Sequence, residues 1–192
     1  MLLGVFDKVM NSYLGPLQSY KSADSGFRLS GYKLENVFAP PVAISMLVQG
    51  YGADHLRQMK KITQLASVEV AIRDTNPGII RVGRNNKTIV EKKLNDEDKK
   101  RKYQGYDSIK NILYSQGARN ILEGEFGIGL HLMGGCRLGV NEKNSVITPD
   151  FHLHGHKNIF IADSSIFPNA PGINPSHTIM ALSKMASESI KL

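Results

Sequence analysis

Cysteine is nearly absent from this sequence, and long apolar runs and internal repeats are missing. Cys136 is the single cysteine among 192 residues, so an internal disulfide scaffold and a zinc site with several cysteines are excluded. No apolar run approaches the roughly 18 residues that a membrane-spanning helix needs, so we expect no membrane span. The opening stretch is too short and too soon charged, at Asp7, for a signal peptide.

What the sequence does contain is typical of a globular protein. Hydrophobic residues make up 41% and charged residues 21% of the chain, which argues against intrinsic disorder. A chain of 192 residues is long enough to bury a core as one domain or as two small ones.

The net charge is moderately positive. Lys and Arg number 24 against 17 Asp and Glu, a formal net charge of +7. Basic residues gather at 57–61 and at 99–102, the second group directly after the acidic residues 96–98. An acidic run followed by a basic run is typical of a solvated helix whose end charges suit its dipole. No RNA-binding aromatic motif or zinc finger accompanies the charge, so we expect no nucleic-acid partner.

Hydrophobic periodicity divides the first two thirds of the chain into strands and helices. The expected strands are 27–38, 67–73, 79–82 and 88–94, with turns at 76–78 and 85–86. The expected helices are 54–65 and 95–117, while 43–49 fits either state. Asn95 would cap the longer helix, whose inward stripe would be Ile109, Ile112, Leu113 and Gln116. The expected fold class is α+β, an antiparallel sheet with helices on one face.

The last third differs in composition and holds most of the residues that could carry chemistry. Glycines crowd between residues 127 and 139, and residues 158–163 form a short apolar stretch that ends at Asp163. We expect that stretch to be a buried strand and residues 176–190 to be a helix packed against it. Asn174 would cap this helix and Pro175 would be its first residue. A strand-end carboxylate and a helix N-terminus would then converge on a polar ligand.

Three histidines and the single cysteine each allow two interpretations. His152, His154 and His156 recur at every second position, which fits a metal site or a strand that ends in a turn at Gly155. Because no carboxylate or cysteine ligands stand at matching spacing, we favour the strand. Cys136 fits a nucleophile or a small buried side chain, and the second is favoured because cysteine-protease surroundings are absent.

Two further histidines stand beside special backbone. His131 precedes a run of closely spaced glycines, where the backbone is expected to approach something bulky. Packing alone also explains a histidine in such a place, so a structural and a catalytic role both stay open. His177 falls in the first turn of the last helix, where the dipole disfavours an imidazolium, and a neutral role is expected.

The stretch that begins at His131 and the stretch that begins at Asp163 together resemble the signature region of the glucose–methanol–choline oxidoreductases. These enzymes are flavin-dependent alcohol oxidases and dehydrogenases. The matching segments are 131–139 (HLMGGCRLG), 145–150, 154–155, 158–168 and 172–182 (GINPSHTIMAL). Their order and spacing agree over the last sixty or so residues. Weaker similarity at 15–19, 73–78 and 116–121 extends the resemblance over most of the chain.

One departure from the family pattern bears on the domain organisation. The family binds the ADP half of FAD with a Gly-x-Gly-x-x-Gly turn near the N-terminus, and this sequence has no such turn. The resemblance therefore implies a substrate-binding region at 1–125 and, at 126–192, a C-terminal strand–loop–helix segment that completes a flavin-binding domain. The N-terminal flavin-binding half would be a partner. Alone, the chain is expected to purify without FAD and to self-associate through exposed apolar surface.

The resemblance also implies roles for individual residues. His131 matches the family's base, and Asn174 matches the donor to the alkoxide side of the substrate, a small-molecule alcohol, polyol or sugar. The residues that match positions beside the flavin are Asp163, Ser164, Gly172, Asn174 and Pro175. The helix that starts at Pro175 would direct its positive end at the flavin. No metal is implied.

Two functions are consistent with the sequence. The first is the C-terminal part of an FAD-dependent alcohol oxidoreductase that is inactive alone. The alternative is a truncated, catalytically incompetent scaffold or interaction module. No motif indicates which alcohol is the substrate or which molecule accepts the electrons. The sequence therefore does not distinguish an oxidase from a dehydrogenase.

Overall fold

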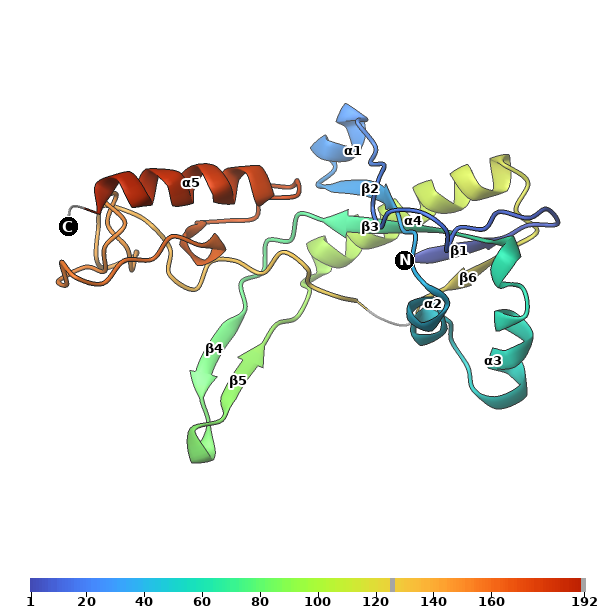
Figure 1. Cartoon of the computed structure of the whole chain (residues 1–192), viewed down its shortest axis with the longest axis horizontal. Coiled ribbons are helices and arrows are strands. Elements are labelled where there is room, and N and C mark those ends of the chain that lie inside the picture. Colours follow the sequence, from blue (N-terminus) through green and yellow to red (C-terminus); the bar gives the residue numbers. More distant parts are fainter. Residues whose placement is uncertain (125–126, 191–192) are drawn as a thin grey trace. The chain divides into compact units, whose positions relative to one another are not determined.

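The computed structural model describes residues 1–124 and 127–190. The chain divides into two compact units (Figure 1). Unit 1 comprises Met1–Arg73 and Leu94–Ile128, and unit 2 comprises Asp74–Lys93 and Gly129–Leu192. Among the described residues, none of the helices is both long and apolar enough to cross a membrane.

Unit 1 is built on a four-stranded antiparallel sheet with the order β2-β3-β1-β6. The strands are β1 (Leu2–Val5), β2 (Tyr32–Asn36), β3 (Leu65–Ile72) and β6 (Asn120–Glu123). The expected α+β class with an antiparallel sheet is confirmed. The expected membership of the sheet is wrong, because residues 79–82 and 88–94 pair only with each other. Their places are taken by β1 and β6, which lie far apart in the sequence.

Four short helical segments connect the strands of unit 1. They are α1 (Ser25–Leu29), α2 (Pro41–Leu47), α3 (Gly52–Met59) and the 3₁₀ turn η1 (Ile62–Gln64). The expected strand at 27–38 is therefore too long at its start, because Asp24 accepts the Phe27 N–H at 3.0 Å and caps a helix there. The stretch at 43–49, which fitted either state, is mainly helical. It belongs to α2, whose first turn contains Pro41, a residue that suits the start of a helix.

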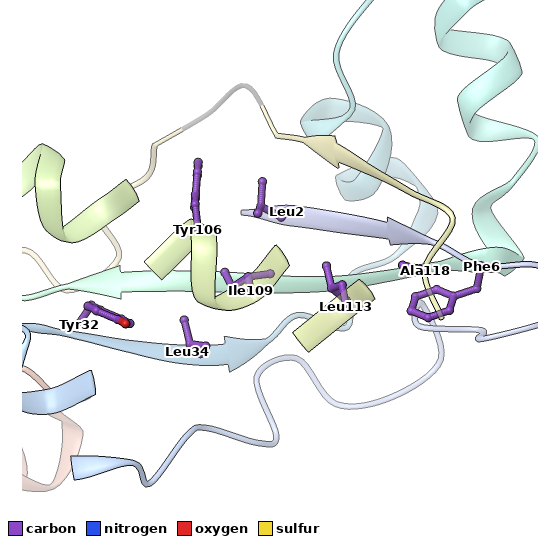
Figure 2. Close-up of a cluster of buried hydrophobic side chains, with 8 residues drawn as sticks. All are labelled: Leu2, Phe6, Tyr32, Leu34, Tyr106, Ile109, Leu113 and Ala118. Atoms are coloured by element: carbon purple, nitrogen blue, oxygen red, sulfur yellow. The ribbon is translucent and has the colours of Figure 1, made fainter. Parts of the chain in front are cut away.

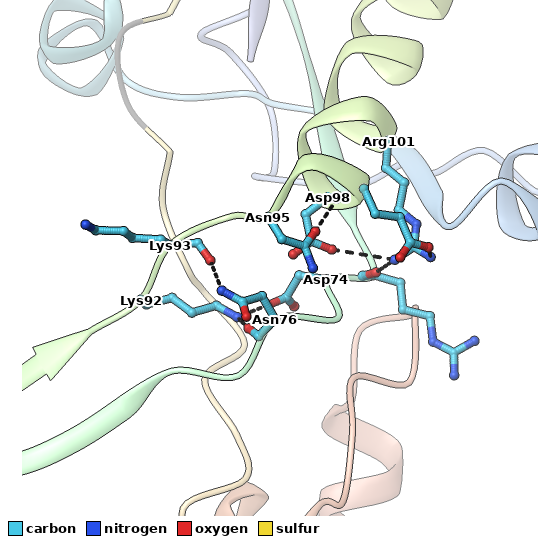
Figure 3. Close-up of polar contacts among 9 residues, drawn as sticks. Asp74, Asn76, Lys92, Lys93, Asn95, Asp98 and Arg101 are labelled. Atoms are coloured by element: carbon cyan, nitrogen blue, oxygen red, sulfur yellow. Dashed lines mark hydrogen bonds and ion pairs between the residues drawn. The ribbon is translucent and has the colours of Figure 1, made fainter.

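The long helix α4 (Asp96–Ser115) begins as the sequence predicts. The Asn95 side chain accepts the Asp98 N–H at 2.8 Å, which caps the helix (Figure 3). Lys99 pairs with Asp96 at 3.0 Å, and Arg101 pairs with Glu97 one turn away. The acidic-then-basic run thus forms the start of a helix, as expected, but it is solvated only in part, because Asp98 is buried and the Arg101 side chain is 18% exposed.

One face of the sheet packs against α4 (Figure 2). The buried side chains of this core are Leu2, Phe6, Tyr32, Leu34, Tyr106, Ile109, Leu113 and Ala118. Of the expected inward stripe, Ile109 and Leu113 are confirmed. Ile112 is 44% exposed and Gln116 is exposed, because the buried face of α4 continues from Leu113 back to Tyr106 instead.

The opposite face of β1 has its own hydrophobic cluster. Leu3 and Val5 alternate with Leu2 along the strand and so point to the other side. They pack with residues that follow β2 and with Ile44 of α2. Within β2, Lys33 and Glu35 are buried and joined by an ion pair of 2.7 Å.

Unit 2 contains a two-stranded hairpin of β4 (Ile79–Val82) and β5 (Thr88–Glu91). Asn85 and Asn86 stand at its tip with φ values of 58° and 56°, and the Lys87 N–H donates to the Arg84 carbonyl at 3.3 Å. Positive φ at both central residues is the geometry of a type I′ turn, which Asn tolerates. The strand at 79–82 and the turn at 85–86 are confirmed, and the strand expected at 88–94 is confirmed only as far as Glu91.

The rest of unit 2 is mostly irregular backbone around a small core. Its regular elements are the 3₁₀ turn η3 (Ser164–Ile166) and the helix α5 (Ser176–Ser189). The core consists of Ile147, Phe151, Ile166 and Ala186, against which Ala162 and Leu182 pack. The Ser183 hydroxyl also donates to the Ala162 carbonyl, which confirms that the last helix packs on this segment.

The expected strand at 158–163 is wrong. In this segment the described chain has an isolated bridge between His152 and Phe160 but no strand. Ile159 is 42% exposed, so the apolar stretch is not continuously buried. A short apolar run bounded by polar residues cannot by itself be told from irregular backbone.

A substitution in α4 tests the contact between this helix and the sheet. Gly105 is buried, and a Cβ atom there would lie 2.2 Å from Cγ2 of Val70. Alanine normally stabilises a helix by about 0.5–1 kcal/mol relative to glycine. We expect Gly105→Ala instead to lower the free energy of unfolding by about 1–3 kcal/mol through overpacking.

Urea unfolding followed by circular dichroism measures this difference. The control is Asn111→Ala on the exposed side of α4, which should be neutral or slightly stabilising. Equal stabilisation by both substitutions would show that α4 does not approach β3 as described.

Candidate functional site

Two glycine- and serine-containing segments of unit 2 are held together by backbone hydrogen bonds. The N–H groups of Gly134, Cys136 and Leu138 donate to the carbonyls of Ser164, Ser165 and Ile166 at 3.3, 2.9 and 3.0 Å. The Ser164 hydroxyl donates to the Leu132 carbonyl at 2.9 Å. The loop that follows His131 therefore lies along η3, and two segments that the sequence singled out separately are brought together.

The loop keeps this path because both of its ends are constrained. Gly134 has a φ of 92°, a conformation that favours glycine, and a Cβ there would lie 3.5 Å from the Phe167 carbonyl. At the other end, Leu138 forms a bridge to Ile147, which is fully buried in the core of unit 2. Cys136 packs against the same core, in agreement with a structural cysteine.

His154 supports the loop from the other side. Its Nε2 atom lies 3.1 Å from the Gly139 carbonyl and 3.0 Å from the Ser145 hydroxyl. A carbonyl only accepts hydrogen bonds, so Nε2 carries the proton. The Ser145 hydroxyl donates to the Asn141 carbonyl at 2.7 Å. His154 thus contacts both Gly139 and Ser145, a structural role.

The three alternating histidines do not converge on one point. His152 contacts the Leu153 carbonyl through Nδ1 at 3.2 Å and lies edge-on to the Phe160 ring. Over residues 1–124 and 127–190, the structure contains no group of three or more His, Cys, Asp or Glu side chains arranged to hold a metal ion. His156 is exposed in the turn at Gly155, where φ is 77°.

Asp163 directs its carboxylate into η3. It accepts the Ser165 N–H at 2.8 Å and caps the turn. The Ser165 side chain and N–H hold the pKa of Asp163 below its ordinary value. Asp163 is therefore ionised at neutral pH and orders the segment that receives the His131 loop. Ser165 was not singled out from the sequence, because only its contacts reveal this role.

The start of α5 differs from the expectation. Pro175 is the cap residue and has no side-chain capping bond, so the prediction that Asn174 caps this helix is wrong. The Pro175 carbonyl instead accepts the Ile179 N–H at 2.8 Å. Proline at this position fixes the backbone and carries no acceptor side chain. Gly172, with a φ of 76°, turns the chain just before it.

The two candidate catalytic residues occupy different segments of unit 2. His131 is exposed at the start of the loop along η3, and Asn174 is partly buried before α5. His177 lies in the first turn of α5, as expected, and its side chain is exposed. The hydrogen bonds between the loop and η3 do not include Asn174, so its pairing with His131 stays a prediction.

Comparison with known proteins gives concordant matches. A family model described as GMC oxidoreductase matches residues 54–183. An uncharacterized GMC-type oxidoreductase of Mycobacterium tuberculosis is 28% identical over 95% of this chain and 32% of its own length. Long-chain-alcohol oxidase FAO4A of Arabidopsis thaliana is 26% identical over 67% of this chain and 22% of its own length. The chain thus spans about a third or less of the curated relatives named here.

Two solved structures share the fold at low sequence identity. Pyridoxine 4-oxidase from Mesorbium loti has a TM-score of 0.66 at 15% identity, with 97% of this chain and 41% of that chain covered. Formate oxidase of Aspergillus oryzae has a TM-score of 0.65 at 16% identity, with 98% and 44% covered. In both, the match covers less than half of the longer protein.

The titration of Asp163 tests the geometry of η3. A lowered pKa in the folded state means that the ionised carboxylate stabilises the fold above the ordinary pKa, and that this stabilisation is lost as pH falls through the folded value. Ser165→Ala removes the largest cause of the shift, so we expect the pKa of Asp163 to rise toward its ordinary value.

Carboxyl carbon chemical shifts measured by NMR against pH report this pKa directly. Ser164→Ala is the matched control, because its hydroxyl bonds Leu132 and not Asp163. An unchanged Asp163 titration in Ser165→Ala would contradict the contact between the Ser165 side chain and the Asp163 carboxylate.

Proposed function

Because this chain belongs to the GMC oxidoreductase family and corresponds to its C-terminal region, we propose that it carries the catalytic base of an FAD-dependent alcohol oxidoreductase. The observation that carries this proposal is the set of hydrogen bonds between residues 134–138 and η3. They give the loop after His131 a fixed course beside Asp163 and Ser164. A positioned histidine next to an ordered polar turn suits acid–base chemistry.

The chain's own residues fit one part of a flavin site. α5 starts at Ser176 after its cap residue Pro175, which makes no side-chain capping bond, and the positive end of this helix would suit an electron-rich group. Gly172 and Gly134 have positive φ and no side chain, which allows a flat ring to approach the backbone. Asp163, Ser164, Gly172, Asn174 and Pro175 are proposed to line this side of FAD.

The other part of the flavin site is missing from the sequence. The chain has no Gly-x-Gly-x-x-Gly turn for the pyrophosphate. We therefore propose that the ADP half of FAD is held by an N-terminal flavin-binding half outside this sequence. It follows that this chain alone should not retain FAD. When bound, FAD supplies the acceptor for the hydride.

The proposed steps use two side chains. The neutral imidazole of His131 accepts the hydroxyl proton of the alcohol, and the Asn174 amide donates a hydrogen bond to the oxygen as negative charge develops. Oxidation of the alcohol also removes a hydride from the same carbon, and FAD held beside Asp163, Ser164, Gly172, Asn174 and Pro175 would supply the acceptor for it. On the side of this chain, the hydroxyl proton passes to His131 as the alcohol becomes a carbonyl compound.

The substrate class is proposed only as a primary or secondary alcohol, which includes polyols and sugars. The similar proteins are described variously as a long-chain-alcohol oxidase, a 6'''-hydroxyparomomycin C oxidase and a 2-methyl-1,2-propanediol dehydrogenase. Their chemistry has the CH–OH group in common, and they include both oxidases and dehydrogenases.

A catalytically incompetent interaction module remains the alternative. It is favoured by the missing dinucleotide turn and by apolar side chains that unit 2 leaves exposed. Leu130, Leu132 and Val140 are 59%, 76% and 85% exposed in the described chain. The proposed enzyme covers such side chains with its N-terminal half, whereas the module would cover them with another copy or a different protein.

Substitution of the two histidines distinguishes these possibilities in a protein that contains both halves. We expect His131→Ala to slow flavin reduction by alcohol about 10²–10⁴-fold, the usual contribution of a positioned base. Asn174→Ala should slow it by about 10²–10³-fold through loss of one donor. His177→Ala is the control and should have little effect, because His177 is exposed within the helix.

Anaerobic stopped-flow absorbance measures the reduction, with bound flavin quantified first. If the flavin were reduced at the normal rate in His131→Ala and not reduced in His177→Ala, the base would be His177. Failure of the unsubstituted protein to bind flavin would favour the interaction module.

A further inference from the structure

The hairpin β4–β5 presents an apolar face that is exposed to solvent. Ile80 lies opposite Val90, and Val82 lies opposite Thr88, so these four side chains share one face. Ile80, Val82 and Val90 are 66%, 76% and 65% exposed. Exposed β-branched side chains gathered on one face of a hairpin indicate a surface that is covered by something else.

The opposite face of the hairpin has a different character. Arg81 and Glu91 form an ion pair across the two strands there, and Ile79 and Ile89 flank this pair. Ile89 is only 36% exposed. One face of the hairpin thus carries Ile80, Val82 and Val90 beside Thr88 and no charged side chain of the paired strands. The other face carries the salt bridge beside Ile89 and Ile79, which is 59% exposed.

The hairpin is ordered at both ends. At its base, Lys92 contacts the Asp74 carboxylate and the Asn76 carbonyl, and the Asn76 side chain donates to the Lys93 carbonyl at 2.6 Å (Figure 3). At its tip, the turn at Asn85 and Asn86 closes the strands. A surface held in its binding shape loses little conformational freedom when it docks.

Charge indicates what kind of surface the hairpin fits. Residues 74–93 contain five Lys or Arg against two Asp or Glu, and Arg84 and Lys87 are exposed at the tip. Two copies docked face to face would bring two positive segments together, which disfavours a second copy. Basic residues around an apolar face are instead the pattern of segments that lie at the surface of an anionic bilayer.

We propose that the apolar face of β4–β5 docks on an anionic lipid surface. Ile80, Val82 and Val90 enter the boundary between headgroups and acyl chains, and Arg84 and Lys87 contact anionic headgroups. The salt-bridged face stays in water. The hairpin thus attaches the protein to one leaflet without crossing the membrane. This assignment does not depend on the alcohol chemistry proposed for unit 2.

Tryptophan fluorescence tests the orientation directly, because the sequence contains no tryptophan. Ile80→Trp places the probe on the apolar face, and Ile79→Trp places it on the opposite face one residue away. With vesicles of phosphatidylcholine and phosphatidylglycerol, emission from Ile80→Trp should move to shorter wavelength while that from Ile79→Trp should not. The shift should weaken in high salt and be absent with phosphatidylcholine alone.

Charge reversal provides a second measurement, by co-sedimentation with the same vesicles. Arg84→Glu with Lys87→Glu should weaken binding about tenfold or more, because each basic residue adds to attraction at the leaflet. Lys60→Glu with Lys61→Glu is the control, with the same change in charge placed on unit 1.

Three results would overturn the proposal. They are no shift with anionic vesicles, equal shifts from the two tryptophan variants, and equal weakening by the two charge reversals. A shift of Ile80→Trp emission that depends on protein concentration without vesicles would assign the face to a second copy instead.

Discussion

The hydrogen bonds from residues 134–138 to η3 are the interaction on which the candidate site depends. They join a glycine-rich loop, which has little regular structure of its own, to the turn η3. Asp163 caps this turn, and its Ile166 side chain is buried in the core of unit 2. Backbone donors matched to backbone acceptors fix the loop without demanding particular side chains. The course of the loop after His131 is therefore set by the backbone.

Local features of the fold were predictable because each depends on a few neighbouring residues. The cap at Asn95 and the turn at Asn85 and Asn86 follow from side-chain and φ preferences that act within one turn. The partners of the strands were not predictable, because β1 pairs with β3 and β6 across long stretches of sequence. The alternation that identified residues 79–82 as a strand contains no information about which sheet it joins.

The site shows the same division. The resemblance singled out His131, Asn174 and the segment of η3 as candidates, because their motifs keep fixed order and spacing, and their roles stay predictions. It did not reveal that Ser165 lowers the pKa of Asp163 or that His154 contacts the Gly139 carbonyl, since both depend on contacts between residues. The sequence predicted Asn174 as the cap of α5, because asparagine is a favoured cap residue. In the structure, Pro175 is the cap residue instead.

Amide hydrogen exchange measured by NMR tests most directly whether the loop after His131 is held on η3. We predict that the N–H groups of Gly134, Cys136 and Leu138, which donate to η3, exchange at least about tenfold more slowly than those of Gly135 and Arg137 between them. Uniformly fast exchange at all five positions would contradict it, because the loop would then have no fixed course and His131 no defined place.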